Sequence, residues 1–443
     1  MTNSRRPDHP FVAAIRNVDP VRRIGAVTRV MPTFIEADGP GAPLGSLCSI
    51  GRDNEAPVLA EIVNVELGRV TLAPYAPVAS TRVGDEVRAL RLGANVPVGP
   101  AYLGRVIDPL GRPLDGGAPF GAPAAHWPLA GAATAPLDRV SPGTPLATGI
   151  RALDALLTLG VGQRAGIFAG SGVGKTTLLG SLARHIEADV CVLCLVGERG
   201  REAEEFWSRT LSDAARARST MVVATSDQPA VMRARSVLVA LSIAEYFRAQ
   251  GQHVLLMLDS VTRYALALRE IGLAAGEPPT VRAYTPSVFA ALPKIVERCG
   301  ALKPGGAITA LMTVLTETDE IDDPMAETMR ALLDGHIVLT RELAERGHFP
   351  AIQVPRSVSR VFQHVANAEQ RALAADAVAQ LALYESSKTL VESGLYAAGS
   401  NPELDRALRL RPELIAFLRQ DTETAVPREE AIARLGALLK ERR

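Results

Sequence analysis

The sequence predicts an α/β protein in three parts: a small N-terminal β-barrel, a core in which a parallel sheet lies between helices, and a C-terminal helical domain. Short β-rich runs broken by Gly, Pro and Asp fill residues 21–92, which is typical of a small antiparallel barrel. From Gly160, runs that are apolar on both faces alternate with helical patterns, and this indicates a buried parallel sheet. After about Asn367 the strand patterns stop. We therefore expect domains at 1–97, 98–366 and 367–443.

Each part has its own evidence along the chain. In the barrel, strand-like runs cover residues 25–30, 58–65 and 70–73, and a Gly/Pro/Ala-rich stretch at 115–136 is expected to separate the barrel from the core. In the core, strands are expected at 165–169, 190–196, 221–225 and 253–258, with a helix from Lys175 to about Glu187. In the tail, Asn401-Pro402-Glu403 has the order expected for a helix start.

Composition restricts the classes of protein that fit. The chain has 48 basic and 48 acidic residues, so no overall field gathers nucleic acid or acidic lipid. Its four cysteines are scattered, which indicates a reducing compartment. Cys191 and Cys194 form a C-x-x-C inside an apolar run, and without a second pair they are expected to be buried in a strand.

No apolar stretch approaches the ~20 residues needed to span a bilayer, so a cytoplasmic protein is expected. Phe11, Ile15 and Val18 would share one face of a short N-terminal helix. That face fits either peripheral membrane association or packing on the protein's own domain.

A phosphate-binding loop is the strongest local motif. Residues 169–176 read AGSGVGKT, directly after an expected strand and directly before an expected helix. Glycines let backbone N–H groups turn around a polyphosphate, while Lys175 reaches the β- and γ-phosphates and Thr176 binds Mg²⁺. Ala169 replaces the usual first glycine, which is acceptable at a strand end with negative φ. The expected nucleotide-binding residues are Gly170, Ser171, Gly172, Val173, Gly174, Lys175, Thr176 and Thr177.

A second magnesium ligand is expected at Asp259, which ends the apolar run that begins at His253. The carboxyl ends of neighbouring parallel strands open on one crevice, so Asp259 can hold a water of the metal beside Thr176. By itself, an aspartate at the end of a strand is more often only a helix cap. The adjacent phosphate loop favours the metal role.

Several further motifs resemble the catalytic subunits of rotary ATP synthases and, most closely, the protein-export ATPases of flagella and virulence injectisomes. They form an ordered set over most of residues 100–365, together with the phosphate loop: LGRVIDPLGRPLD (103–115), GERGRE (197–202), YTPSVFAALP (284–293), IDDPM (321–325), LDGHIVL (333–339) and SVSRVF (357–362). The resemblance implies a RecA-like P-loop core that hydrolyses ATP with Mg²⁺.

The resemblance also implies roles for individual residues. Glu198 is expected to be the catalytic glutamate, Arg199 and Arg263 to lie near the γ-phosphate, and Arg360 to be an arginine finger that reaches the neighbouring subunit's site. Phe349 matches the aromatic that stacks on adenine, where relatives often have Tyr. Gln353 replaces an aspartate of the family pattern, so the contact made by that acid is in question.

Glu198 and Arg360 occur together in this one chain, whereas rotary synthases divide them between two kinds of subunit. A closed head-to-tail ring of identical subunits would then have a site at every interface, so we expect a homohexamer. The resemblance further implies stator and stalk partners, chaperone–substrate complexes that meet the helical domain, and a peripheral position at the cytoplasmic face of the inner membrane. It does not distinguish a flagellum from an injectisome.

Three other functions fit the sequence less well. A Rho-like nucleic-acid translocase would stack bases on barrel aromatics along a basic groove, but residues 21–92 contain only Phe34 and Tyr75 and no basic cluster. A non-catalytic ring subunit would lack the carboxylate of Glu198. The tail motif SGLYAAGSNPELD (393–405) and the short remaining chain resemble export ATPases more than a rotary synthase subunit.

Overall fold

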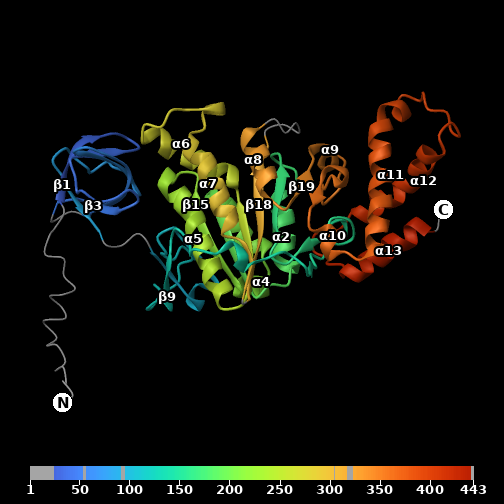
Figure 1. The fold of residues 1–443 in the computed structure, drawn as a ribbon, viewed down its shortest axis with the longest axis horizontal. Helices are drawn as coiled ribbons and strands as arrows, with labels where there is room; N and C mark the ends of the chain where they lie inside the picture. The colour runs from blue at the N-terminus through green and yellow to red at the C-terminus, as the bar shows by residue number, and fades with distance from the viewer. Residues whose placement is uncertain (1–23, 53–55, 91–94, 304, 317–322, 441–443) are drawn as a thin grey trace, which may run out of the picture. The chain divides into compact units, whose positions relative to one another are not determined.

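The computed structural model describes residues 24–52, 56–90, 95–303, 305–316 and 323–440. The chain divides into two units, residues 1–94 and 95–443 (Figure 1). The N-terminal face suggested by Phe11, Ile15 and Val18 lies outside the described residues.

The first unit contains the closed antiparallel barrel that the sequence predicts. Alternating side chains of its strands, such as Ala60 and Ile62, are buried in the barrel, as expected for strands with one face in a core. The strands close in the order β1-β2-β5-β4-β3-β6. They are β1 (Ile24–Val30), β2 (Ile35–Ala37), β3 (Leu47–Gly51), β4 (Val58–Glu66), β5 (Arg69–Pro74) and β6 (Glu86–Ala89).

The second unit is built on a sheet of mainly parallel strands, in the order β20-β19-β13-β18-β16-β14-β15-β8 (Figure 1). All neighbours from β19 to β8 are parallel, and β20 is antiparallel to β19. The strands of this path are β8 (Arg105–Ile107), β13 (Arg164–Ala169), β14 (Val190–Glu198), β15 (Ser219–Thr225), β16 (His253–Asp259), β18 (Ala307–Leu315), β19 (Gly335–Leu339) and β20 (Val358–Ser359).

Helices cover both faces of this sheet, so its strands are buried on both sides, as their continuous apolar runs predict. On β14, Leu193 and Leu195 join the core cluster with α2 and the C-terminal helices, whereas Val192 and Val196 join the cluster with α5 to α8. The helices of the core are α2 (Lys175–His185), α3 (Gly200–Glu205), α4 (Asp213–Ala217), α5 (Ala230–Ala249), α6 (Val261–Ala274), α7 (Pro286–Glu297), α8 (Pro324–Leu332), α9 (Arg341–Glu345) and α10 (Phe362–Val365).

Cys191 and Cys194 lie in β14 and are fully buried, which confirms that they belong to a strand core. Burial raises the pKa of both thiols to about 12, so neither is a reactive thiolate at neutral pH.

The Gly/Pro/Ala-rich stretch at 115–136 does not separate the barrel from the core as predicted, because the two units divide between residues 94 and 95 and β8 already belongs to the core sheet. It contains β9 (Ala125–Pro128), which pairs antiparallel with β7 (Asn95–Val98). Trp127 of β9 donates a hydrogen bond through Nε1 to Glu245 of α5 at 2.8 Å, which fixes the segment to the core. Short strands of two or three residues add smaller pairings: β10 (Arg139–Val140) with β17 (Gly300–Leu302), and β11 (Pro145–Leu146) with β12 (Leu159–Gly160).

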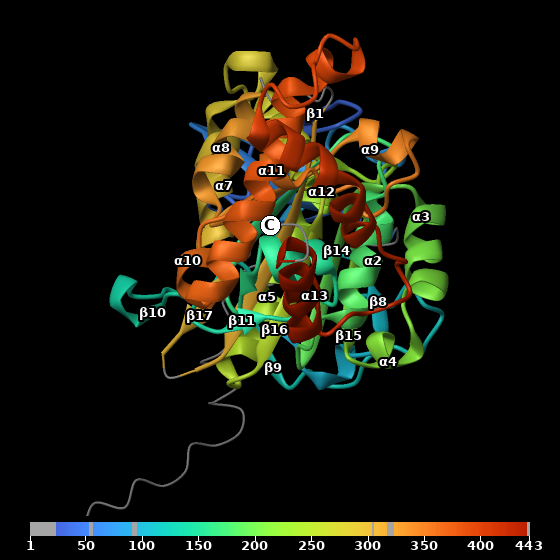
Figure 2. The same ribbon diagram turned by 90° about the vertical axis from the view of Figure 1, so that its right-hand side faces the viewer.

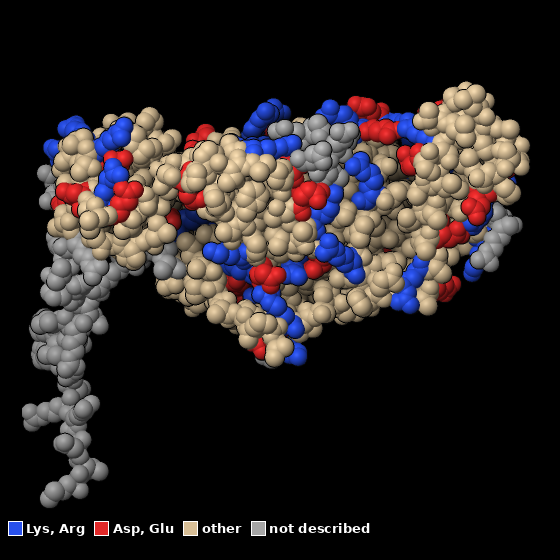
Figure 3. Space-filling view, turned by 45° about the horizontal axis from the view of Figure 1, so that its top comes forward, with Lys and Arg blue, Asp and Glu red and all other residues tan. Residues whose placement is uncertain are grey.

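After residue 367 the described chain is helical, as predicted: α11 (Ala368–Glu392), α12 (Pro402–Leu418) and α13 (Arg428–Lys440) (Figure 2). The helix start expected at residues 401–403 is confirmed, because the Asn401 side chain accepts hydrogen bonds from the N–H groups of Glu403 and Leu404. Among the described helices, none is both long and apolar enough to cross a bilayer. Lys and Arg side chains are interspersed with Asp and Glu on the face shown in Figure 3.

Candidate active site

The phosphate loop lies between β13, which ends at Ala169, and α2, which begins at Lys175. Gly172 and Gly174 have φ of 77° and 85°, a left-handed conformation that favours glycine. The loop therefore turns tightly into the N-terminus of α2, where backbone N–H groups without helical partners attract a phosphate. Thr176 and Thr177 are exposed in the first turn of α2.

Glu198 is the last residue of β14, and the residue before it explains how its side chain is presented. The pairing of β14 with β15 shifts between Val196 and Glu198, which is a β-bulge at Gly197. Gly197 has a φ of 68°, and a Cβ there would lie 3.0 Å from Cδ of Arg263. Glycine is thus required both for the backbone conformation and for the close approach of Arg263.

Three charged side chains meet at the carboxyl edge of the sheet. Lys175 donates a hydrogen bond from Nζ to Oδ1 of Asp259, the last residue of β16, and its Nζ lies 3.6 Å from Oε1 of Glu198. The sequence predicts that these residues share one crevice, and the structure places them there. Thr313 of β18 adds a contact that the sequence analysis missed, since its hydroxyl donates to Asp259 Oδ1 at 2.7 Å. Its only signal is a polar residue inside an apolar strand.

Arg263 of α6 joins the same cluster. Its Nε lies 3.2 Å from Oε1 of Glu198, and its Nη2 donates to Oε2 at 3.3 Å. Glu198 Oε1 is buried and has no hydrogen-bond donor among the described residues. This carboxylate oxygen is therefore held by two cations in ion pairs and keeps its capacity to accept a hydrogen bond from a small donor such as water.

The pKa of Glu198 lies above its ordinary value of 4.5. Burial is the largest cause, and the nearby Asp259 also raises the pKa, whereas Lys175 and Arg263 lower it. Because burial outweighs the two cations, Glu198 takes up a proton more readily than an exposed glutamate.

This raised pKa predicts the acid limb of the pH–rate profile. If Glu198 is the general base of ATP hydrolysis, kcat/KM should fall as the pH drops through its raised pKa in the free enzyme, because a base works only when deprotonated. We expect the midpoint of this limb well above 4.5. Steady-state rates at saturating Mg²⁺, where MgATP is the only substrate species, measure it. A midpoint at the ordinary carboxyl value would contradict a buried Glu198 as the base.

Phe349 lies over the phosphate loop. A Cβ added to Gly174 would lie 3.3 Å from the ring, and the Phe349 side chain is 41% exposed. A shallow cleft opens beside the ring. Its lining includes Gln420, Asp421 and Thr422, from the loop between α12 and α13. The sequence does not predict that these residues line the cleft, because they follow Phe349 by about seventy positions and belong to no local motif.

Gln353, which stands where the family pattern has an aspartate, has a polar partner in this structure. Its side-chain oxygen accepts a hydrogen bond from the Thr340 hydroxyl at 3.2 Å. An amide oxygen can take the place of a carboxylate as an acceptor, so the replacement leaves the Thr340 hydroxyl with a partner.

Two expected site residues lie away from this cluster. Arg199 is exposed and forms an ion pair with Glu202, three residues further along the chain, with Nη1 3.7 Å from Oε1. Arg360 follows β20 and is also exposed. Five strand steps separate β20 from β14, so at ~4.8 Å per step Arg360 is roughly 24 Å from the strand of Glu198. Arg360 cannot reach Glu198 of its own subunit.

Comparison with known proteins gives consistent matches. Residues 149–359 match the model of the ATP synthase alpha/beta family, nucleotide-binding domain, and residues 366–437 match the T3SS EscN ATPase C-terminal domain. The chain is 45% identical over 433 residues to the flagellum-specific ATP synthase of Bacillus subtilis, covering 97% of this chain and 98% of the relative. It is 46% identical over 420 residues to the SPI-2 type 3 secretion system ATPase of Salmonella typhimurium, covering 95% of each.

Solved structures agree with these relatives. The assembled ATPase EscN from the enteropathogenic E. coli type III secretion system superposes with a TM-score of 0.89 at 41% identity, covering 94% of this chain and 100% of that chain. EscN in complex with its central stalk EscO gives a TM-score of 0.85 at the same identity and coverage.

Proposed function

The chain belongs to the family of flagellar and type III secretion ATPases, and on that premise we propose that it hydrolyses MgATP at sites shared between neighbouring subunits of a homohexamer. It is an ATPase of type III protein export. The observation that carries the proposed site is the meeting of Lys175, Glu198 and Asp259 at the carboxyl edge of one sheet.

In the proposed mechanism, loop N–H groups from residues 170–177 and the ammonium of Lys175 hold the β- and γ-phosphates. Glu198 accepts a hydrogen bond from the attacking water and takes its proton as the water oxygen bonds to the γ-phosphorus. The bond from the γ-phosphorus to the β–γ bridging oxygen breaks, and ADP leaves. Arg263 keeps the Glu198 carboxylate in place, and the exposed side chain of Arg199, the residue after Glu198, would approach the γ-phosphate from solvent.

The residues present suit Mg²⁺, which favours hydroxyl, carboxylate and phosphate oxygens and takes only one or two carboxylates from the protein. Thr176 would supply the hydroxyl, and Asp259 would hold a water of the ion. When bound, the ion would neutralise charge on the phosphate oxygens. Phe349 would stack on the adenine in the cleft that Gln420, Asp421 and Thr422 help to line.

The position of Arg360 supports a shared site. Because it is exposed and lies at the far side of the sheet from Glu198, it suits a neighbouring subunit's site. In a head-to-tail ring each subunit would give its Arg360 to the next, and six identical interfaces would form six sites.

Partners follow from the relatives. EscN was solved in complex with its central stalk EscO, so we propose a stalk protein in the ring of this chain. We also propose a stator, chaperone–substrate complexes that meet the helical domain, unfolding of the released cargo, and a cytoplasmic position peripheral to the inner membrane. The match of residues 366–437 to the EscN C-terminal domain favours export over a rotary synthase subunit or a Rho-like translocase.

Glu198→Gln tests the proposed base. The amide keeps the shape of the side chain and loses the charge that polarises water, so we expect turnover to fall by about 10²- to 10⁴-fold while MgATP still binds. Steady-state hydrolysis and equilibrium binding of a fluorescent ATP analogue measure the two effects. Glu205→Gln, at an exposed carboxylate at the end of α3, is the control and should retain turnover. A parallel loss of binding and turnover in Glu198→Gln would make Glu198 a structural residue.

A further inference from the structure

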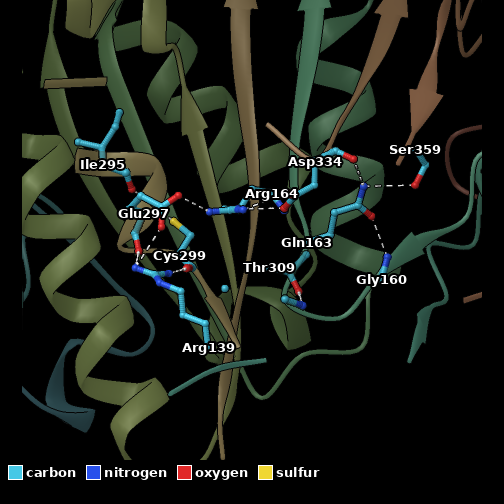
Figure 4. Close-up of polar contacts among 12 residues, drawn as sticks. Arg139, Gly160, Gln163, Arg164, Ile295, Glu297, Cys299, Thr309, Asp334 and Ser359 are labelled. Atoms are coloured by element: carbon cyan, nitrogen blue, oxygen red, sulfur yellow. Dashed lines mark hydrogen bonds and ion pairs between the residues drawn. The ribbon is translucent and has the colours of Figure 1, made fainter. Parts of the chain in front are cut away.

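A buried carboxamide joins the strand of the phosphate loop to the segment that carries Arg360. Gln163 is fully buried and directly precedes β13. Its Nε2 donates hydrogen bonds to the Asp334 carbonyl and the Ser359 hydroxyl, both at 3.2 Å (Figure 4). Its Oε1 accepts from the Gly160 N–H at 2.9 Å. Both ends of the carboxamide are therefore engaged, and two of its three partners belong to β20 or to the residue that precedes β19.

The same two partners fix the backbone of Arg360. The Arg360 N–H donates to the Asp334 carbonyl at 2.9 Å, the oxygen that also accepts from Gln163. Ser359, the residue before Arg360, donates a hydrogen bond from its hydroxyl to the Thr158 carbonyl at 2.9 Å. The backbone that carries Arg360 is thus held by its own N–H and by the side chain of the residue before it.

Asp334 is itself clamped to β13. Its carboxylate accepts from the N–H, Nε and Nη2 of Arg164 at 2.9 to 3.0 Å, and its N–H donates to the Arg164 carbonyl at 2.8 Å (Figure 4). The next residue, Gly335, allows β20 to approach closely, since a Cβ there would lie 2.5 Å from the Val358 carbonyl oxygen. The acceptor of the Arg360 N–H therefore moves with β13.

The guanidinium of Arg360 has less support than its backbone. The side chain is exposed, and its Nη2 donates to the Arg330 carbonyl at 3.2 Å. Where an exposed arginine points depends first on where its backbone is held. The contacts of Gln163, Ser359 and Asp334 are therefore what place Arg360 at the surface.

We propose that Gln163 is a positioning residue for catalysis in the neighbouring subunit: its carboxamide sets the backbone from which Arg360 reaches out. This inference rests on the proposed function, in which Arg360 completes the next subunit's site. The strand β13 then has two tasks, because its carboxyl end begins the phosphate loop and its amino end sets the arginine given to the neighbour. A displacement of β13 in one subunit would therefore affect both that subunit's own phosphate loop and the site that receives its Arg360.

Gln163→Met removes the hydrogen bonds and keeps a similar side-chain volume. Misplacement of a catalytic group by about 1 Å can cost 10²-fold, so we expect turnover to fall about 10- to 100-fold with MgATP binding unchanged. Ser359→Ala is a milder second variant, which removes the hydroxyl shared by Gln163 and Thr158, and should shift turnover in the same direction.

Thr309→Val is the matched control. The Thr309 hydroxyl is also buried and accepts from the N–H of Gly162, the residue next to Gln163, at 2.8 Å (Figure 4). It has no hydrogen bond to β20 in the described structure. A comparable loss of a buried hydrogen bond here should leave turnover close to wild type. If Thr309→Val and Gln163→Met lose turnover equally, Gln163 serves only the fold and the proposal is wrong.

Mixed rings separate a positioning role from a structural one. A site is productive when one subunit has Glu198 and its neighbour presents Arg360 correctly. Glu198→Gln subunits present Arg360, so mixing them with Gln163→Met should raise activity above that of either variant alone. Mixing Gln163→Met with Arg360→Ala should give no such gain, because neither subunit presents a well-placed Arg360.

The reference mixture, Glu198→Gln with Arg360→Ala, keeps the two hypotheses apart. If the reference mixture recovers and Gln163→Met recovers only with Glu198→Gln, the positioning role is supported. The reference mixture can recover activity while Gln163→Met gains activity only with Arg360→Ala, or with neither variant. In both of these outcomes this inference fails and the proposed function stands. If the reference mixture stays inactive in rings that demonstrably mix, while a linked dimer with one wild-type subunit is active, Arg360 acts within its own subunit, and both the shared site and this inference fail.

Discussion

Lys175→Ala is expected to leave no measurable ATP hydrolysis and little nucleotide binding. The ammonium of Lys175 is the main side-chain counterion for the β- and γ-phosphates in a loop of this kind. In the structure it also lies between two carboxylates, in a hydrogen bond to Asp259 and 3.6 Å from Glu198. Its removal leaves both carboxylates facing the phosphates without their shared cation. Hydrolysis and equilibrium binding of the fluorescent analogue measure the loss.

The loss must be shown to be local. Removing one partner of a buried ion pair can cost on the order of 3 kcal/mol, so the thermal unfolding of Lys175→Ala should be recorded beside its activity. Lys440→Ala, at an exposed lysine in the last residue of α13, is the control and should retain wild-type turnover. Wild-type turnover in Lys175→Ala itself would rule out the phosphate site proposed for this loop.

Arg360→Ala is expected to lower turnover by on the order of 10³- to 10⁵-fold, the range for arginine fingers that stabilise charge in phosphoryl transfer. Ring assembly and MgATP binding should persist, because Arg360 is exposed and lies at the amino end of β19, whereas the phosphate loop follows the carboxyl end of β13. Arg356→Ala, at another exposed arginine in the preceding turn, tests whether any charge removed from this surface has the same effect.

Recovery in mixed rings gives the sharper result for Arg360. Each of Arg360→Ala and Glu198→Gln should be nearly inactive alone, and a mixture should regain activity at interfaces that combine the intact residue of each. A covalently linked dimer with one wild-type subunit tests whether hydrolysis requires every interface of the ring to be intact. If that dimer is active while mixed rings of the two variants are silent, Arg360 acts within its own subunit. If both are silent, hydrolysis requires every interface to be intact. If Arg360→Ala retains turnover, Arg360 is not the finger.

The sequence alone was sufficient for features whose pattern lies within a short segment. The phosphate loop is one, because its glycines, Lys175 and the start of α2 lie within a few residues. The carboxylates of Glu198 and Asp259 are others, since each ends an apolar strand and parallel strands open on one edge. The alternation in β4 and the helix start at Asn401 follow from equally local rules. In all these cases the backbone geometry of a few consecutive residues determines where the side chains lie.

Contacts between distant segments had to come from the tertiary structure. The sequence contains no sign that the loop of Gln420 to Thr422 lines the cleft beside Phe349, or that Thr313 donates to Asp259. Nor does it show that Gln163 and Ser359, 196 residues apart, share a hydrogen bond. The order of the strands decides which residues become neighbours, and that order results from packing of the whole core. A buried glutamine before a strand looks like any polar turn residue until its partners are known.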